Sequence, residues 1–238
     1  MADLAVDGST LALYHCDGAI ASAEKIDNAE GTSGRDLTEN NTPLASTGFD
    51  GETDGAYNFD GTSEYCVSSA AVFAGTETAA TVEGWFYFDD DAAAEEFFID
   101  TTGGGVGVVM IRNGSSVKGR VRFSVAGGDQ DTGTATVASG GWHYLALTIP
   151  GLIGTVRLYV DGAEAATRVL AAAAGTLGTG ALGLGAARTG SVPANCQVDE
   201  VRVSNVERTS TEISDHWDAN QAATGVVIIP TLLTLGVG

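Results

Sequence analysis

Basic residues are scarce in this chain of 238 residues. Eleven lysines and arginines stand against 31 aspartates and glutamates, which gives a formal net charge of −20. Every phosphate contact would have to overcome this negative field, so the balance excludes a generic nucleic-acid-binding protein. Residues 1–100 hold 21 acids and two bases, whereas residues 101–238 hold 10 acids and nine bases. We therefore expect one edge of the folded molecule to be markedly acidic.

Cysteine is also rare, and the few cysteines form no recognisable pattern. Cys16, Cys66 and Cys196 lack the C-x-x-C spacing of zinc and redox sites, and an odd number does not build a disulfide framework. We expect buried thiols that pack as small hydrophobic side chains. A Cys16–Cys66 bridge is the alternative that the sequence leaves open.

Long hydrophobic runs are missing as well. The N-terminus has no basic residue before Lys25 and no extended apolar core, so it lacks the features of a secretory signal. The longest apolar stretch, residues 226–238, contains Pro230 and is shorter than the roughly 20 residues of a membrane-spanning helix. The sequence therefore predicts a chain without a membrane span that is made in the cytosol.

Helix signals are few, whereas period-two alternation is common and glycine is abundant, at 33 residues. In residues 117–125 (VKGRVRFSV) apolar and polar side chains alternate, as in a half-exposed strand. Residues 142–149 and 155–160 flank a short glycine-containing loop, which predicts a hairpin, and Asp161-Gly162 supplies the next turn. Residues 81–88 are apolar on both faces, as expected for a central strand.

Together these segments predict an all-β fold, a two-sheet antiparallel sandwich with one short C-terminal helix. The helix is expected over residues 209–220, where Thr209 and Glu212 have capping-box spacing. Further strands are expected at residues 10–15, 56–59, 64–68, 96–100, 107–112, 181–185 and 197–204.

The chain divides into one domain, residues 1–220, and an apolar C-terminal arm, residues 221–238. Within the domain, residues 21–55 are polar and acidic and are expected to form a long surface loop. The arm carries no charge, so we expect it to extend from the domain and pack on that domain or on a neighbouring subunit. Its large hydrophobic side chains are Val226, Val227, Ile228, Ile229, Leu232, Leu233 and Leu235.

Six short motifs, in order, resemble the laminin G-like branch of the concanavalin A-like lectin and glucanase jelly rolls. They are Phe59-Asp60-Gly61 with Tyr65, Thr81 to Trp85, Trp142 to Thr148, Leu158 to Gly162, Asp199 to Asn205, and the helix near Ile213. The resemblance covers roughly residues 8–220. It implies a jelly-roll sandwich with one concave sheet, frequent carbohydrate or protein binding, and often a structural calcium ion.

A structural Ca²⁺ is thus the cofactor that the resemblance implies. In related jelly rolls one ion ties the N-terminal strand to the last core strand, which would here recruit Asp199 with Asp17 and Asp60. Calcium takes six to eight oxygen ligands, which carboxylates and turn carbonyls supply. The alternative is that these acids serve turns, because Asp-Gly occurs six times in the chain.

Catalysis is not expected. Glycosidases on this type of sandwich resemble one another in a strand with closely spaced acids of the E-x-D-x-x-E type, which supplies paired carboxylates. Residues 81–88 carry only Glu83, and residues 89–91 form an acidic run that we expect to be solvated. The three histidines, His15, His143 and His216, lie in separate segments.

Four strand aromatics are candidates for stacking on sugar rings: Tyr57, Tyr65, Trp85 and Tyr87. The alternative for each is a place in the core, where aromatic side chains on strands are more often found.

We expect a non-catalytic structural or binding protein. A sandwich usually found outside cells, no secretory signal and an apolar arm favour a virion protein of a tailed bacteriophage, which decorates the capsid or tail. It would be made in the host cytoplasm, assemble through the arm as a homo-oligomer or with other virion proteins, and bind host glycans weakly. The alternative is a carbohydrate-binding or adhesion module of a secreted, extracellular protein. A degenerate glycosidase is the third hypothesis.

Overall fold

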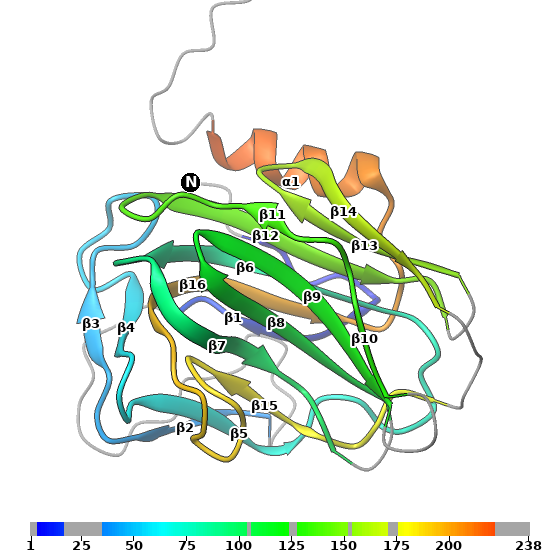
Figure 1. Cartoon of the computed structure of the whole chain (residues 1–238), viewed down its shortest axis with the longest axis horizontal. Coiled ribbons are helices and arrows are strands. Elements are labelled where there is room, and N and C mark those ends of the chain that lie inside the picture. The colour runs from blue at the N-terminus through cyan, green and yellow to red at the C-terminus, as the bar shows by residue number, and fades with distance from the viewer. Residues whose placement is uncertain are drawn as a thin grey trace, which may run out of the picture.

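The chain folds into two antiparallel sheets that pack face to face (Figure 1). The computed structural model describes residues 4–16, 35–103, 106–123, 128–151, 154–170 and 176–221, and within them each sheet has eight strands. Sheet A consists of β1 (Thr10–Tyr14), β3 (Leu44–Ser46), β4 (Ala56–Asp60), β6 (Ala80–Phe88), β12 (Trp142–Ile149), β13 (Thr155–Val160), β14 (Ala163–Val169) and β16 (Asn195–Ser204). Sheet B consists of β2 (Leu37–Asn40), β5 (Tyr65–Ala71), β7 (Ala92–Asp100), β8 (Val106–Gly114), β9 (Ser116–Phe123), β10 (Asp129–Asp131), β11 (Ala135–Thr136) and β15 (Ala181–Leu184).

The strand order places the most apolar strand in the middle of its sheet. Sheet A runs β14-β13-β12-β6-β16-β4-β3 with β1 also paired to β16, and sheet B runs β10-β9-β8-β7-β15-β5-β2 with β11 paired to β9. β6 pairs with β12 on one side and β16 on the other, which agrees with its apolar residues on both faces. This arrangement confirms the antiparallel sandwich predicted from the sequence.

The core lies between the sheets and follows from the alternation of side chains along each strand. On β6, Val82, Phe86 and Phe88 point into the core and are fully buried. The sheets approach closely at Gly119 of β9, where an added Cβ would lie 2.2 Å from Leu147 Cδ1 of β12. A larger residue at this position would push the sheets apart, because protein interiors are close-packed.

The hairpin and the helix are confirmed, whereas the long loop is corrected. β12 pairs with β13, and α1 (Ser210–Gln221) follows β16. The expected loop over residues 21–55 is wrong in its second half, because it contains β2 and β3, the edge strands of their sheets. Such edge strands bury few side chains, and only Leu37 of β2 is fully buried, so they lack the alternation that reveals a strand. Residues 17–34 lie outside the described residues.

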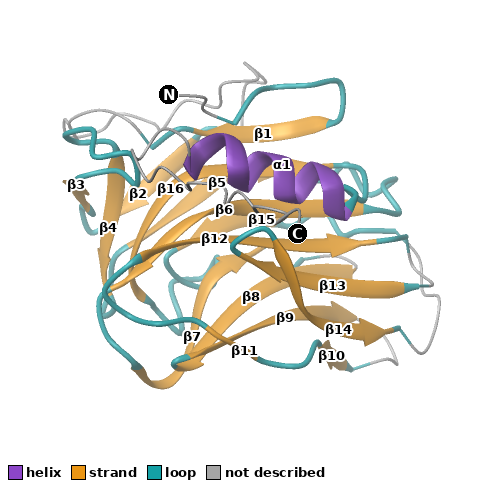
Figure 2. Cartoon of the chain, turned by 90° about the horizontal axis from the view of Figure 1, so that it is seen from above, coloured by secondary structure: helices purple, strands orange, loops and turns teal. Residues whose placement is uncertain are grey.

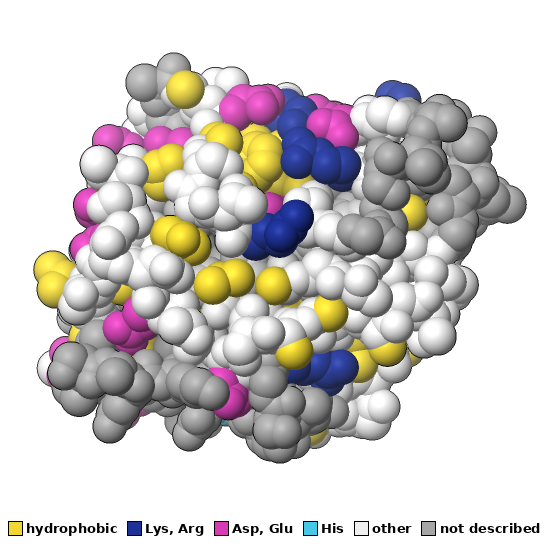
Figure 3. All heavy atoms as spheres, turned by 90° about the horizontal axis from the view of Figure 1, so that it is seen from below, with side chains coloured by type: hydrophobic (Ala, Val, Ile, Leu, Met, Phe, Trp, Pro, Cys, Tyr) yellow, Lys and Arg dark blue, Asp and Glu magenta, His cyan; other side chains and the backbone are white. Residues whose placement is uncertain are grey.

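The outer faces of the two sheets differ. α1 lies across the outer face of sheet A (Figure 2), whereas Figure 3 views the molecule from the side of sheet B, where basic and acidic side chains gather beside hydrophobic ones. Three basic side chains of β9 alternate with core residues, as the sequence predicts, and pair with acids of β7 and β10. The pairs are Lys118–Glu95 at 2.6 Å, Arg120–Asp131 at 2.6 Å and Arg122–Asp129 at 3.1 Å.

The three cysteines are buried, as expected, and Cys16 and Cys66 form no disulfide bridge. Burial raises the pKa of Cys66 and of Cys196, so both thiols stay protonated at neutral pH. Within the described ranges, no helix is both long enough and apolar enough to cross a bilayer.

Candidate functional site

The outer face of sheet A carries α1, which begins with the capping box seen in the sequence. Glu212 Oε2 accepts hydrogen bonds from the Thr209 backbone N–H at 2.7 Å and from the Thr209 hydroxyl at 2.8 Å. The Glu212 N–H donates in return to Thr209 Oγ1 at 3.2 Å. One face of the helix then packs on the sheet, where Ile213 is fully buried and Trp217 stacks on Trp85 with ring centroids 5.2 Å apart.

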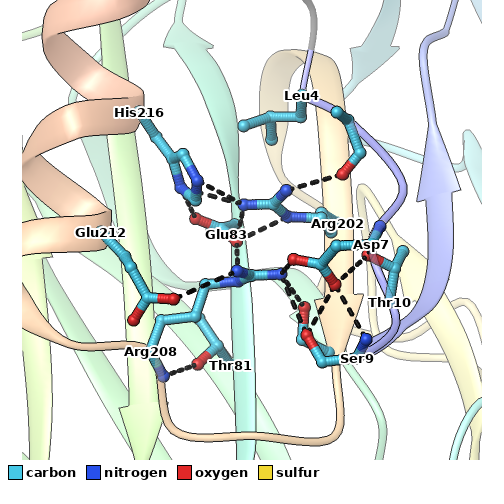
Figure 4. A network of polar contacts seen from close by, with 12 residues as sticks. Leu4, Asp7, Ser9, Thr10, Thr81, Glu83, Arg202, Arg208, Glu212 and His216 are labelled. Atoms are coloured by element: carbon cyan, nitrogen blue, oxygen red, sulfur yellow. Dashed lines mark hydrogen bonds and ion pairs between the residues drawn. The ribbon is translucent and has the colours of Figure 1, made fainter.

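A buried polar network lies beneath this helix (Figure 4). Its centre is Glu83 of β6, which is fully buried and held between two guanidinium groups. Arg202 of β16 donates from Nε to Glu83 Oε1 at 2.8 Å, and Arg208 Nε lies 3.1 Å from the same oxygen. Glu83 Oε2 accepts the hydroxyl of Tyr144 and lies 3.2 Å from His216 Nδ1 of α1. The network therefore ties α1 to β6, β12 and β16.

The charges in this network fix the protonation of Glu83. Burial alone would raise its pKa, but the hydrogen bond with His216 and the positive charge of Arg202 outweigh burial and lower the pKa to about 2. Burial and the charge of Glu83 raise the pKa of Tyr144 well above its usual range, so its hydroxyl remains a donor. At neutral pH Glu83 is an ionised structural anion and has no proton to give to a leaving group.

The outer face of sheet A also carries a row of partly exposed side chains. The cross-strand register places one outward-facing side chain from each of five adjacent strands in a row, which we call the strip: Leu44 on β3, Asn58 on β4, Gln197 on β16, Tyr87 on β6 and Trp142 on β12. Leu44 is exposed and the other four are partly exposed. Four spacings of about 4.8 Å between strands make this row about 19 Å long.

The strip combines two aromatic rings with two amides and contains no charged member. The rings of Tyr87 and Trp142 meet edge to face, with centroids 5.8 Å apart. Gln197 is oriented by the hydroxyl of Ser46, which donates to Oε1 at 2.9 Å, and its Nε2 lies 3.5 Å from Asp89 Oδ1. Such a surface can stack on the apolar face of a sugar ring, and its exposed amide atoms can exchange hydrogen bonds with sugar hydroxyls, whereas Asn58 Oδ1 is buried.

Of the four aromatic candidates from the sequence, the structure places only Tyr87 in the strip. Tyr57 packs in the core between the sheets. Trp85 is 2% exposed, because Phe49 stacks on it at 4.3 Å and Trp217 also covers it. Tyr65 lies on β5, in the other sheet.

Sequence reasoning missed Trp142, Asn58 and Gln197. Trp142 shares its strand face with Tyr144, so the alternation of residues 142–149 could have shown that it points away from the core. The amides carried no such signal, because only the pairing of β4, β16 and β6 aligns them with Tyr87.

The residues proposed for calcium do not meet. Asp60 pairs with Asn195 on β16, and Asp199 lies four residues further along that strand, which separates the two acids by about 13 Å. Asp60 Oδ1 instead accepts the N–H groups of Thr62 and Ser63 at 2.8 and 2.9 Å, which is the turn role left open as the alternative. Among the described residues no three His, Cys, Asp or Glu side chains are grouped as a metal site requires. Asp17 and the arm, including Val226 to Leu235, lie outside the described residues.

A family model described as the concanavalin A-like lectin/glucanases superfamily, of the laminin G type, matches residues 60–214, well over half of the chain. The chain belongs to this superfamily. The match spans most strands of both sheets and the first turn of α1, so it includes Glu83, Tyr87, Trp142 and Gln197. Comparison with curated proteins gives no match.

Solved structures similar to this member of the superfamily include receptor-binding domains of botulinum neurotoxins. A botulinum neurotoxin type C structure, described by the dependence of cell entry on interaction with two ganglioside molecules, has a TM-score of 0.67 at 10% identity over 90% of this chain. The type DC binding domain in complex with SialylT has a TM-score of 0.66 at 10% identity over 90% of this chain. This chain spans about half of those domains, 51% and 52% of their lengths. At this identity the similarity supports the fold alone.

Proposed function

We propose that this chain is a non-catalytic carbohydrate-binding module that binds a neutral glycan across the strip. The observation that carries the proposal is the row of two aromatic and two amide side chains, all partly exposed, on the outer face of sheet A. The strip is uncharged in a molecule with a net charge of −20, so it favours a neutral polyhydroxylated ligand over a charged one. Membership in a lectin and glucanase superfamily supports the same ligand class.

The state of Glu83 supports the non-catalytic part of the proposal. Glycoside hydrolysis generally needs two carboxyl groups about 5 to 9.5 Å apart on either side of the scissile bond, one of them protonated. Glu83 is fully buried beneath α1 and is held ionised by Arg202 and Arg208. It therefore suits the anchoring of the helix and not proton transfer to a substrate.

The similar structures concern gangliosides and SialylT, and this chain covers only about half of each of them. Binding of a glycan to a cell surface is therefore part of our proposal, as is the place of this module in a secreted, extracellular protein.

The test removes the aromatic rings of the strip. A glycan array first identifies a neutral oligosaccharide that the full chain binds, and titration calorimetry then compares variants. We expect Tyr87→Ala with Trp142→Ala to weaken binding at least about tenfold, which corresponds to about 1.4 kcal/mol. Tyr65→Ala, which removes a partly exposed ring from sheet B, is the matched control and should bind as the unmodified chain does. Undiminished binding by the double variant, or an array without any neutral ligand, would refute the proposal.

Assembly through the arm is a second candidate function, favoured by a sequence of 18 residues without charge, 221–238. In this proposal the domain is a building block of a homo-oligomer or of a virion, and glycan binding is secondary.

A further inference from the structure

A cavity of about 330 Å³ opens beside the first turn of α1, away from the strip. Its lining includes Arg157 and Tyr159 of β13, Glu164 of β14, and Glu207 and Ser210 at the start of the helix. Arg157 pairs with Thr148 on β12, six residues from Trp142, so the cavity lies about 20 Å from the aromatic end of the strip. It is thus a separate place on the same face of sheet A.

The charged side chains at the cavity hold one another in position. Arg157 Nε lies 3.0 Å from Glu164 Oε2, and Arg157 Nη1 lies 3.1 Å from Glu207 Oε1. In the part of the chain that the structure describes, the second oxygen of each carboxylate has no hydrogen-bond partner. Arg157 therefore fixes two carboxylates whose remaining oxygens are free to accept hydrogen bonds from a ligand.

The other walls of the cavity are a ring and hydrogen-bond donors. Tyr159 is 2% exposed and lies at the base of the cavity, and burial, with the nearby charge of Glu164, raises the pKa of its hydroxyl, which stays protonated. Ser210 adds a hydroxyl and a backbone N–H at the start of α1. The cavity thus presents hydrogen-bond acceptors and donors above a buried ring.

The charges favour an uncharged occupant. The lining holds two acids and two arginines: Glu164 and Glu207 would repel an anion, whereas Arg157, Arg208 and the positive end of the α1 dipole would repel a cation. A sugar hydroxyl both donates and accepts, so neighbouring hydroxyls can use the carboxylates and the helix N–H at once. The volume lies at the lower end of the range for small-ligand sites, about 300 to 1,000 Å³.

We propose that this cavity is a second saccharide site, which takes one neutral pyranose ring independently of the strip. The inference rests on the proposed carbohydrate-binding function for its ligand class and adds a position and a charge preference. Arg157 acts as a positioning residue, because it orients Glu164 and Glu207.

The test uses three monosaccharides of similar shape and different charge on the ¹⁵N-labelled full chain. Glucose should shift the backbone amide signal of Ser210 and the side-chain Nε–H signal of Arg157. Glucosamine and glucuronate should bind at least about fivefold more weakly, because each meets a like charge. Equal shifts with all three sugars, or no shift at Ser210 with glucose, would overturn the inference.

Substitutions test whether glucose binds in this cavity. Glu164→Gln with Glu207→Gln should weaken glucose binding at least about fivefold, because the charged acceptors are lost. Glu95→Gln, which changes a partly exposed acid on sheet B, should leave it unchanged. Both changes affect side chains that are at least partly exposed, so the folded spectrum should persist. Undiminished glucose binding by the variant with Glu164→Gln and Glu207→Gln would show that the cavity is not the glucose site.

The proposals for the strip and for the cavity can be refuted independently of each other. Tyr87→Ala with Trp142→Ala should leave the glucose shift at Ser210 intact. Glucose shifts confined to the strip would refute the cavity and keep the proposed function. Glucose shifts at Ser210 without oligosaccharide binding at the strip would refute the proposed glycan site on the strip and keep the proposed saccharide site in the cavity.

Discussion

At the scale of the residue, Glu83 links α1 to sheet A through His216 and Arg202. Glu83→Gln keeps the shape of the side chain but leaves the buried guanidinium groups of Arg202 and Arg208 facing an uncharged amide. Removing one partner from a buried ion pair typically costs about 3–5 kcal/mol. We expect a loss of this size in the free energy of unfolding, measured by urea denaturation at neutral pH.

Asp131→Asn is the matched control, because it also removes one acid from a pair with arginine. Asp131 is 30% exposed in the row of ion pairs on sheet B, so its loss should cost no more than about 1 kcal/mol. Equal losses in the free energy of unfolding would show that the network beneath α1 stabilises the fold no more than a surface ion pair does.

The same carboxylate gives the stability of the protein a pH dependence. The pKa of Glu83 is lowered to about 2 in the folded protein from an ordinary value of 4.5. A lowered pKa stabilises the fold above pH 4.5, and this contribution is lost as the pH falls from 4.5 towards 2. Urea denaturation across this range should show a smaller decline for Glu83→Gln than for the unmodified chain. Parallel declines would contradict the assigned role of Glu83.

The sequence could show Glu83 only as a lone acid in an apolar strand. Its partner Arg202 is 119 residues away, and Tyr144 is 61 residues away. The local alternation of apolar and polar residues does not show which distant residues meet, because the order of strands in a sheet is set by packing of the whole chain. The strip is hidden in the sequence for the same reason, and the sequence indicates Tyr87 only as one of four separate aromatic residues on strands.

At the scale of the element, the turn between β13 and β14 supports α1. Asp161 and Gly162 have φ angles of 50° and 78°, and an added Cβ on Gly162 would lie 2.8 Å from Trp217 Cδ1 of the helix. Gly162→Ala would therefore strain the backbone and also push α1 away from sheet A. We expect it to cost roughly 2–4 kcal/mol in the free energy of unfolding, measured by thermal or urea denaturation.

Gly114→Ala separates these two effects. Gly114, the last residue of β8 before the turn to β9, has a φ angle of 58°, and an added Cβ there would meet no atom within 4 Å. Its substitution should cost only about 1 kcal/mol, the backbone part of the effect. If both glycine variants lower the free energy of unfolding equally, the close packing of Trp217 against Gly162 makes no separate contribution to stability.

Elements with a regular pattern were predicted correctly, and those without one were missed. β9 was found from alternating basic and apolar residues, and α1 from its capping box. β2, β3 and β10 are edge strands of three or four residues, in which most side chains are at least partly exposed. Such strands form because a neighbouring strand supplies hydrogen bonds, and their own sequence contains little sign of it.

At the scale of the whole molecule, the arm contrasts with the domain that precedes it. The chain carries a net charge of −20, yet residues 221–238 contribute none of it. α1 ends at Gln221, and Trp217, in its last two turns, packs against the β13–β14 turn. Removing residues 222–238 therefore leaves the described contacts of α1 in place.

Deletion of residues 222–238 tests whether the arm joins subunits. Covering seven large hydrophobic side chains is favourable, so we expect the full chain to elute as an oligomer and the shortened chain as a monomer. Size-exclusion chromatography with light scattering measures both masses, and near-ultraviolet circular dichroism confirms that the aromatic packing around Trp85 survives. Ile228→Asp with Leu233→Asp keeps the length and should also give a monomer, because a buried unpaired charge is costly. A full chain that scatters as a monomer of 24.1 kDa, or a shortened chain that remains oligomeric, would refute assembly through the arm.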